Sequence, residues 1–364
     1  MAQQEEPKIR YTIRDDLRQP DLRKNLSEDY RDLKENFLDE EKKERLKNMG
    51  AIRRFFKISW WLLRAMFFRM TPVRRLLFVL GVILILLSNV EFQAAGGSTG
   101  SSNSHVIGGF ILVFVLMLEL KDKLLAKDEL EAGHKVQLAL MPDENPKIEG
   151  WNVWLFTKSA NDVGGDLIDY IEFDKEEYGI SIGDVAGKGL SAALIMAKLQ
   201  ATIRALASRE ISLTELISKI NKIFHRDSLK SIFASLIYIH VKSNHDQLRL
   251  VNAGHMPPVI IKENEIENLP KGGPAVGLMN ELDLPEKQIE LKKGEKLFIY
   301  SDGITEATDE NGDFFGEHRL MKVLENQKHR SADDLGQYVI KTVEDYRGNA
   351  RINDDLSIVV LEKT

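Results

Sequence analysis

Four places along the chain put a carboxylate where an apolar segment meets a turn, an arrangement that suits metal chemistry. The segments are VGGD, SIGDVAGKG, FIYSDG and NDDLSIVV, and the aspartates are Asp166, Asp184, Asp302 and the pair Asp354–Asp355. Ionised carboxylates at buried strand ends are costly and repel one another unless cations neutralise them. Aspartate and glycine are also common turn residues, so each position alone is weak evidence and only the set indicates a site.

The ligand chemistry of this set favours hard cations. Carboxylate oxygens, in a chain with no cysteine, select Mg²⁺ or Mn²⁺ over zinc. Glycines beside the aspartates let the backbone approach a metal or a phosphate closely; they include Gly164, Gly165, Gly183 and Gly303. His255, in NAGH, is a candidate proton donor by residue type, but its setting favours a loop-shaping role.

The elements that must position these aspartates form one domain over residues 142–364. Short apolar runs predict strands at 151–156, 166–173, 178–184, 233–242, 248–253, 259–261, 288–291, 296–301 and 356–361. Helices are predicted at 188–208, 212–224, 316–324 and 331–346. Runs of consecutive strands interrupted by a helix pair indicate an α+β fold rather than repeated βαβ units.

The composition of the chain excludes several classes of protein. Its 364 residues include 50 Lys and Arg against 56 Asp and Glu, a formal net charge of −6, and 43% hydrophobic residues. This mild acidity argues against a nucleic-acid binder that works through bulk charge. The absence of cysteine rules out disulfides, thiolate metal sites and a cysteine nucleophile.

The segment before the domain has the character of a membrane anchor. Residues 1–57 predict a charged cytoplasmic tail, with an exposed helix over 31–47. Residues 58–120 begin with an aromatic and Arg-rich stretch over 58–70, typical of a helix at a membrane interface. Two uncharged runs follow, 76–90 and 106–118, joined by a Gly/Ser-rich stretch at 96–104.

Both runs are shorter than the roughly 18–20 residues of a comfortable span, so buried core helices are the alternative. The runs lack a polar face, and flanking apolar residues extend them, which favours a two-helix transmembrane hairpin. Lys and Arg lie before the first run and after the second, and the connecting loop has neither. The positive-inside rule therefore predicts a multi-pass protein with both ends, and the catalytic domain, in the cytoplasm.

Residues 119–141 predict a helix that ends at Pro142 and joins the two parts. Its apolar stripe is imperfect, and Gly133 weakens its middle by about 1 kcal/mol relative to alanine. Such a helix suits either a regulatory switch that forms a homodimer or a plain spacer, and the sequence favours neither.

From residue 136 onward the chain resembles the metal-dependent protein phosphatases (PPM family), in the bacterial RsbU/SpoIIE-like branch. The matching segments, in family order, are VQLALMP (136–142), NDVGGDLIDYIEF (161–173), GISIGDVAGKGLSAALIMAKLQATIRA (179–205), LVNAGHMPPVII (250–261), KGGPAVGLM (271–279), KKGEKLFIYSDGITEATDENGDFFGEHRL (292–320) and NDDLSIVVLEK (353–363). They cover the whole predicted domain, whereas residues 1–118 have no part in the resemblance.

The resemblance implies a four-layer α–β–β–α sandwich with two divalent ions, Mn²⁺ or Mg²⁺, between the sheets. Asp184 would bridge both metals, and the carbonyl of Val185 would complete one shell. Asp302 and Asp354 would bind the other metal, and Asp166 would bind nearby, directly or through water. The family pattern of Asp, then Asn or Asp, an apolar residue and Ser or Thr favours Asp354 over Asp355.

The implied activity is hydrolysis of phosphoserine or phosphothreonine in a protein, without a covalent phosphoenzyme. The expected substrate is a regulatory phosphoprotein such as a STAS-type anti-anti-sigma factor, and the expected location is the inner membrane of a bacterium. The alternative is a catalytically silent relative that acts as a membrane-bound interaction module. The complete set of aspartates favours the enzyme, because a silent relative commonly loses one.

Overall fold

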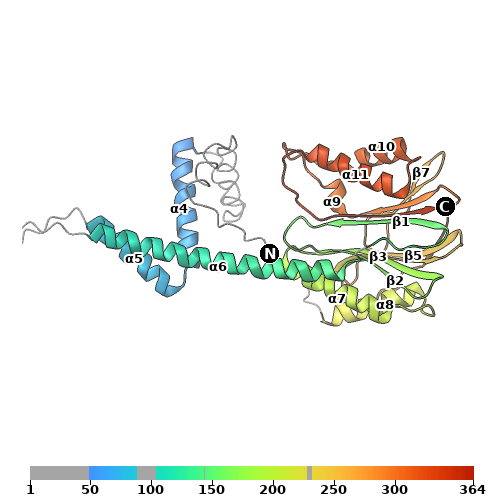
Figure 1. Cartoon of the computed structure of the whole chain (residues 1–364), viewed down its shortest axis with the longest axis horizontal. Coiled ribbons are helices and arrows are strands. Elements are labelled where there is room, and N and C mark those ends of the chain that lie inside the picture. The colour runs from blue at the N-terminus through green and yellow to red at the C-terminus, as the bar shows by residue number, and fades with distance from the viewer. Residues whose placement is uncertain (1–48, 88–103, 143, 228–231) are drawn as a thin grey trace, which may run out of the picture. The chain divides into compact units, whose positions relative to one another are not determined.

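The computed structural model describes residues 49–87, 104–142, 144–227 and 232–364 (Figure 1). The chain divides into two compact units, Met1–Leu124 and Leu125–Thr364. The exposed helix predicted over 31–47 and the connecting stretch over 96–103 lie outside the described residues. The second unit begins within the predicted linker helix, earlier than the expected domain start at residue 142.

The first unit contains α4 (Ala51–Arg69), α5 (Pro72–Leu86) and the beginning of α6 (Ser104–Leu140). α5 and α6 pack closely through glycines, because a Cβ added at Gly108 would lie 2.6 Å from the carbonyl oxygen of Gly81. Arg74 of α5 pairs with Glu119 and Asp122 of α6 at 3.0 and 2.7 Å. None of the helices in the described ranges is both long and apolar enough to cross a membrane.

The second unit is built on two antiparallel sheets, so the predicted α+β class is confirmed. The first sheet has the order β1 (Trp151–Lys158), β10 (Leu356–Lys363), β9 (Lys296–Tyr300), β6 (Val259–Ile261) and β7 (Ile266–Asn268). The second has the order β2 (Asp166–Glu172), β3 (Glu177–Val185), β4 (Ala234–Lys242), β5 (Gln247–Ala253) and β8 (Lys287–Glu290).

Helices cover the outer face of each sheet, which gives four layers (Figure 1). α7 (Leu190–Leu206) and α8 (Leu213–Asp227) pack on the β2–β8 sheet through Leu199, Ile217 and Leu236. α9 (Asp302–Thr305), α10 (Gly316–Gln327) and α11 (Ala332–Arg347) pack on the β1–β7 sheet. A third apolar core fills the space between the sheets, with Ile182 and Ile299 among its members. Burying both faces of each sheet explains why the strands are apolar on both sides.

Two short elements and one long helix differ from what the sequence predicts, besides shifts of a few residues at the ends of other elements. β7 and α9 are short elements that the apolar pattern does not reveal. The predicted helix over 119–141 is the end of α6, which is continuous from Ser104 to Leu140 and passes through Gly133 without a break. One glycine costs only about 1 kcal/mol, which a helix of 37 residues tolerates.

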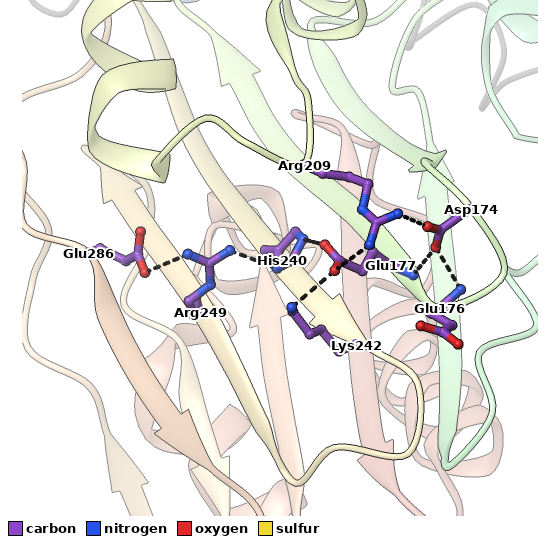
Figure 2. Close-up of polar contacts among 8 residues, drawn as sticks. All are labelled: Asp174, Glu176, Glu177, Arg209, His240, Lys242, Arg249 and Glu286. Atoms are coloured by element: carbon purple, nitrogen blue, oxygen red, sulfur yellow. Dashed lines mark hydrogen bonds and ion pairs between the residues drawn. The ribbon is translucent and has the colours of Figure 1, made fainter.

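A network of hydrogen bonds and ion pairs joins the connection between α7 and α8 to strands β3, β4 and β5 of the second sheet (Figure 2). Glu177 accepts hydrogen bonds from Arg209, which follows α7, and lies 2.9 Å from Nε2 of His240. Arg249 donates to Nδ1 of His240 and to Glu286, whose other oxygen accepts from the backbone of Leu213 in α8. Burial lowers the pKa of His240, and the adjacent Arg249 lowers it further, so the ring is neutral.

Candidate functional site

Strand alternation places several polar residues at one end of the core between the sheets. In β2, β3 and β4 the inward residues Ile168, Ile182 and Ile237 belong to the core between the sheets. Two residues along each strand, on the same face, stand Asp166, Asp184 and Ser235. The register pairs Asp166 with Asp184 and Asp184 with Ser235, so the three side chains form one row across the sheet.

The opposite sheet supplies a matching polar end. The inward face of β10 carries Leu361, Val359 and, at the end near the aspartates, Ser357. The inward face of β9 carries Ile299, and Ser301 follows on the same side just after the strand. The Ser301 hydroxyl donates to the carbonyl of Asp355 at 3.1 Å, and the Ser357 hydroxyl lies 2.9 Å from that of Thr157. Ser301 also accepts a hydrogen bond from the backbone of Ser357 at 3.0 Å. Polar side chains of both sheets therefore close this end of an otherwise apolar core.

Several carboxylates lie close together at this end of the core. Burial raises the pKa of Asp166 well above its usual value, and the charge of Asp184 raises it further. Burial, followed by the charges of Asp302 and Asp354, raises the pKa of Asp184 to about 7. Burial and Asp354 also raise the pKa of Asp302. The structure therefore brings all four sequence-predicted aspartates into one electrostatically coupled group.

Asp354 and its neighbour Asp355 have different roles. Asp355 is buried, and its carboxylate accepts backbone N–H groups of Ala160, Gly165 and Asp166 at 2.7, 2.7 and 3.2 Å. Asp354 is 35% exposed, and its Oδ2 pairs with Lys188 at 3.0 Å. Asp355 thus clamps the loop that leads to Asp166, while Asp354 keeps an oxygen within reach of solvent and mobile cations.

Glycines keep a small pocket beside Asp184, Asp354 and Asp355 open; they include Gly164, Gly165, Gly187 and Gly189. A Cβ on Gly164 would lie 2.4 Å from Oδ2 of Asp355, so no larger residue fits there. A Cβ on Gly165 would lie 3.2 Å from the carbonyl oxygen of Val185, so the backbone of Val185 passes close to Gly165. Lys188 also lines the pocket, a position that the sequence pattern does not indicate.

The donor set of this pocket fits hard divalent cations. Asp184, Asp354 and Asp355 line the pocket, whereas Asp166 and Asp302 are not among its lining residues; Oδ2 of Asp166 is buried and has no hydrogen-bond partner among the described residues. Within the described part of the chain, no three His, Asp or Glu side chains already stand close enough to hold a single ion. The fit therefore rests on the type and accumulation of oxygens, and a preformed two-metal site is not seen.

The helix α6 reaches this pocket through Gln137, a contact that the sequence pattern does not reveal. The Gln137 side chain is buried; its Nε2 donates to the carbonyl of Gly164 at 2.8 Å, and its Oε1 accepts from the Gly164 N–H at 3.1 Å. The end of α6 is also bound to α7, because Gln200 donates to the Leu140 carbonyl. Only the polar residue in the quoted segment VQLALMP could have signalled this contact.

Comparisons with known proteins agree with this architecture. The family model described as Stage II sporulation protein E (SpoIIE) matches residues 174–364, a little over half of the chain. Phosphoserine phosphatase RsbU of Bacillus subtilis (strain 168) is 26% identical over 239 residues, 65% of this chain and 70% of that protein. Phosphoserine phosphatase RsbP of the same organism is 23% identical, over 66% of this chain and 59% of its own length.

Solved structures show the same fold at low sequence identity. The SiaA-PP2C domain of Pseudomonas aeruginosa superposes with a TM-score of 0.58 at 20% identity, covering 66% of this chain and 98% of that domain. A structure of the PP2C phosphatase domain of SpoIIE from Bacillus subtilis, with a fragment of its regulatory domain, gives a TM-score of 0.50 at 20% identity. It covers 58% of this chain and 63% of that structure. The chain therefore belongs to the SpoIIE family, and its Leu125–Thr364 unit is a protein serine/threonine phosphatase domain of the PP2C type.

Proposed function

We propose that this domain hydrolyses phosphoserine or phosphothreonine in a regulatory protein, using two Mn²⁺ or Mg²⁺ ions. The observation that carries the proposal is the convergence of Asp166 and Asp184 from one sheet with Asp302 and Asp354 from the other. Burial raises the pKa of Asp184 to about 7, and the charges of Asp302 and Asp354 contribute, which supports a site that is neutralised by cations. Divalent cations would neutralise these carboxylates, which would explain why so many of them lie together.

The proposed ligands are those that the family resemblance implies, and two of them, Asp184 and Asp354, line the pocket. Asp184 would contact both ions, and the Val185 carbonyl would complete one shell. Asp302 and Asp354 would hold the second ion, with Asp166 near it, directly or through water. When bound, the ions would supply an activated water and neutralise the phosphoryl oxygens. Manganese and magnesium both accept such oxygen ligands.

The chain's own residues would position and screen the phosphoryl group. Lys188 is 61% exposed, and its ammonium group pairs with Asp354 and donates to the carbonyl of Asn353. A lysine on this rim can turn to an incoming phosphoryl oxygen as a flexible point charge. The glycines at 164, 165, 187 and 189 leave room for the phosphoryl group and expose backbone around it.

The proposed substrate is a phosphorylated STAS-type anti-anti-sigma protein or a similar regulator. Support comes from RsbU and RsbP, both of which are named phosphoserine phosphatases. The chain spans only 59% of RsbP and 35% of a further relative, protein IcfG of Synechocystis. The substrate and the regulatory inputs of those whole proteins are therefore extended to this chain only as a proposal.

We further propose that residues 58–120 hold the protein at the inner membrane of a bacterium, with the phosphatase domain in the cytoplasm. α4 carries five basic residues and no acidic one, and it exposes Trp60 and Leu63. Exposed aromatic and aliphatic side chains among cations suit the surface of an anionic bilayer. The α6 segment over 119–140 exposes Leu120, Leu124 and Val136, which supports the proposed homodimer contact.

Phosphate release from a phosphoserine STAS-domain protein tests the proposed chemistry. The chain, stripped of metal by chelation, is expected to be inactive and to regain activity with Mn²⁺ or Mg²⁺. Asp166→Asn should abolish the regained activity. Asp169→Asn, three positions further along β2 and on its outer face, serves as the matched control and should keep the metal dependence. Release that persists in excess chelator would refute the metal requirement.

The membrane proposal has its own test. The protein should stay with the membrane pellet after alkaline carbonate extraction of bacterial membranes, and a variant lacking residues 1–118 should be soluble. Recovery of the full chain in the carbonate supernatant would contradict the hairpin without affecting the phosphatase assignment.

A further inference from the structure

His255 is a buried residue that connects the two sheets next to the carboxylates. Its side chain is 6% exposed, and its Nδ1 lies 2.8 Å from Oγ of Ser235 on β4. Its Nε2 is buried and makes no hydrogen bond within the described residues. The backbone of Tyr300, at the end of β9, is near enough to raise the pKa of the ring, although burial lowers that pKa by more. One imidazole therefore lies between the β2–β8 sheet and the β1–β7 sheet.

The loop around His255 holds the ring in a single place. Asn252 accepts the His255 N–H at 2.8 Å and donates to the His255 carbonyl at 3.1 Å. Gly254 has φ +77°, and a Cβ there would lie 2.7 Å from the backbone nitrogen of Ala275. A side chain at 254 is therefore both strained and blocked, so this turn is specific for glycine. Such a rigid turn fixes the direction in which the ring enters the core.

Both contacts of the ring lead directly to proposed metal ligands. Ser235 stands opposite Asp184 in the β3–β4 register, where paired Cβ atoms are about 4.5–5.5 Å apart. Tyr300 is two residues before Asp302, and the intervening Ser301 donates a hydrogen bond to the carbonyl of Asp355, the neighbour of Asp354. The distance between the sheets at His255 thus sets the distance between Asp184 on one side and Asp302 on the other.

The burial of the ring excludes a role as a proton donor to the leaving group. A general acid must reach the substrate oxygen within hydrogen-bond distance, directly or through one water. Burial also lowers the pKa of His255 to about 4, so the ring is neutral at physiological pH. A neutral ring carries one N–H, so it donates through one nitrogen and accepts through the other. This suits a spacer that pairs with the Ser235 hydroxyl of one sheet and faces the Tyr300 backbone of the other.

We propose that His255 is a positioning residue that fixes the separation of Asp184 and Asp302, so that divalent cations fit between the sheets. The inference rests on the proposed metal-dependent function and adds a residue to it. Residues that orient metal ligands typically change metal affinity or activity by about 10- to 100-fold when they are replaced. A purely structural histidine would change stability without changing metal affinity.

Calorimetric titration of the metal-stripped full chain with Mn²⁺ tests this inference. His255→Ala should weaken Mn²⁺ binding by about 10- to 100-fold. His255→Asn, which can keep a polar contact to Ser235, should recover part of that loss. The matched control is His240→Ala, which removes another buried histidine of the same sheet, in the network of Figure 2. It should lower the melting temperature but leave Mn²⁺ affinity within twofold of wild type.

Each outcome separates this inference from the function on which it rests. Wild-type chain that binds no Mn²⁺ would overturn the proposed metal site and the inference with it. Wild-type binding that His255→Ala leaves unchanged, or that His240→Ala weakens equally, would overturn only the positioning role. If His255→Ala fails to fold, the comparison of His255→Asn with His240→Asn gives the same decision.

Discussion

Removing the Gln137 side chain is expected to uncouple α6 from the metal pocket and to lower phosphatase activity. The amide makes two hydrogen bonds to the backbone of Gly164, two residues before Asp166. A net hydrogen bond contributes about 1 kcal/mol, and a buried group left unpaired costs about 1–3 kcal/mol. Gln137→Ala should therefore weaken this docking by roughly 2–4 kcal/mol, on the order of 30- to 1000-fold.

The effect on the reaction comes through the position of Asp166. The loop that Gln137 holds also carries Gly165, which is fixed from the other side by Asp355. With one of the two attachments lost, a displacement of about 1 Å at a ligand can cost on the order of 100-fold in rate. We expect at least a tenfold loss in kcat and a higher Mn²⁺ requirement, with the far-ultraviolet circular dichroism spectrum unchanged.

The assay is Mn²⁺-dependent phosphate release from a phosphoserine protein, measured over a range of metal concentrations. Val136→Ala is the matched control, because Val136 is the preceding residue of α6 and is 62% exposed. Gln137→Glu gives a second test, since a carboxylate can still accept the Gly164 N–H but repels the Gly164 carbonyl. If Gln137→Ala and Val136→Ala were equally active, the contact would be structural and the reasoning wrong.

Three further predictions follow from the carboxylate group and from α6. Asp184→Asn should abolish metal-dependent phosphate release and weaken Mn²⁺ binding in calorimetry, while the chain stays folded. The raised pKa of Asp184 means that the unfolded chain binds fewer protons between pH 4 and 7, so the melting temperature of metal-free protein should fall as pH rises through this window. Saturating Mn²⁺ should abolish that fall, and a melting temperature that ignored pH would contradict the charge accumulation. Gly133→Ala should stabilise α6 by up to about 1 kcal/mol in thermal unfolding, because the added Cβ meets only Val163, at 3.9 Å. A change in basal activity would show a switch, whereas unchanged kinetics would leave α6 a spacer.

The sequence predicts most of the fold because its strands are continuous apolar runs. β3 and β4 are buried on both faces, so their Ile and Val content is visible without a partner. β7, the half-exposed tripeptide Ile266–Asn268, has no such signal and forms only by pairing with β6. The short helix α9 also has no apolar pattern of its own, because its four residues lie within the motif that contains Asp302.

The aspartates of the site are visible in the sequence because each stands beside a glycine or at the end of a strand. Their supports are not visible, because each depends on a contact across a long stretch of chain. Gln137 acts on Gly164 from 27 positions away, and Asp355 acts on Gly165 from 190 positions away. No local propensity encodes such pairs; they follow from the order of strands in the folded unit.

The contacts of Asp354 and Asp355 differ in a way that favours Asp354 as the proposed metal ligand. Neighbouring side chains entering a strand point to opposite sides, so the two carboxylates cannot serve one site equally. Both carboxylate oxygens of Asp355 accept hydrogen bonds from backbone N–H groups, and a metal ion would have to displace those hydrogen bonds. Among the described residues, the Asp354 carboxylate accepts the N–H of Asp355 and pairs with the exposed Lys188. An exposed ion pair of this kind contributes about 0–1 kcal/mol. In the proposed site a divalent cation would displace that lysine at little cost, and the ammonium group would then be free to meet the phosphoryl oxygens at the same pocket.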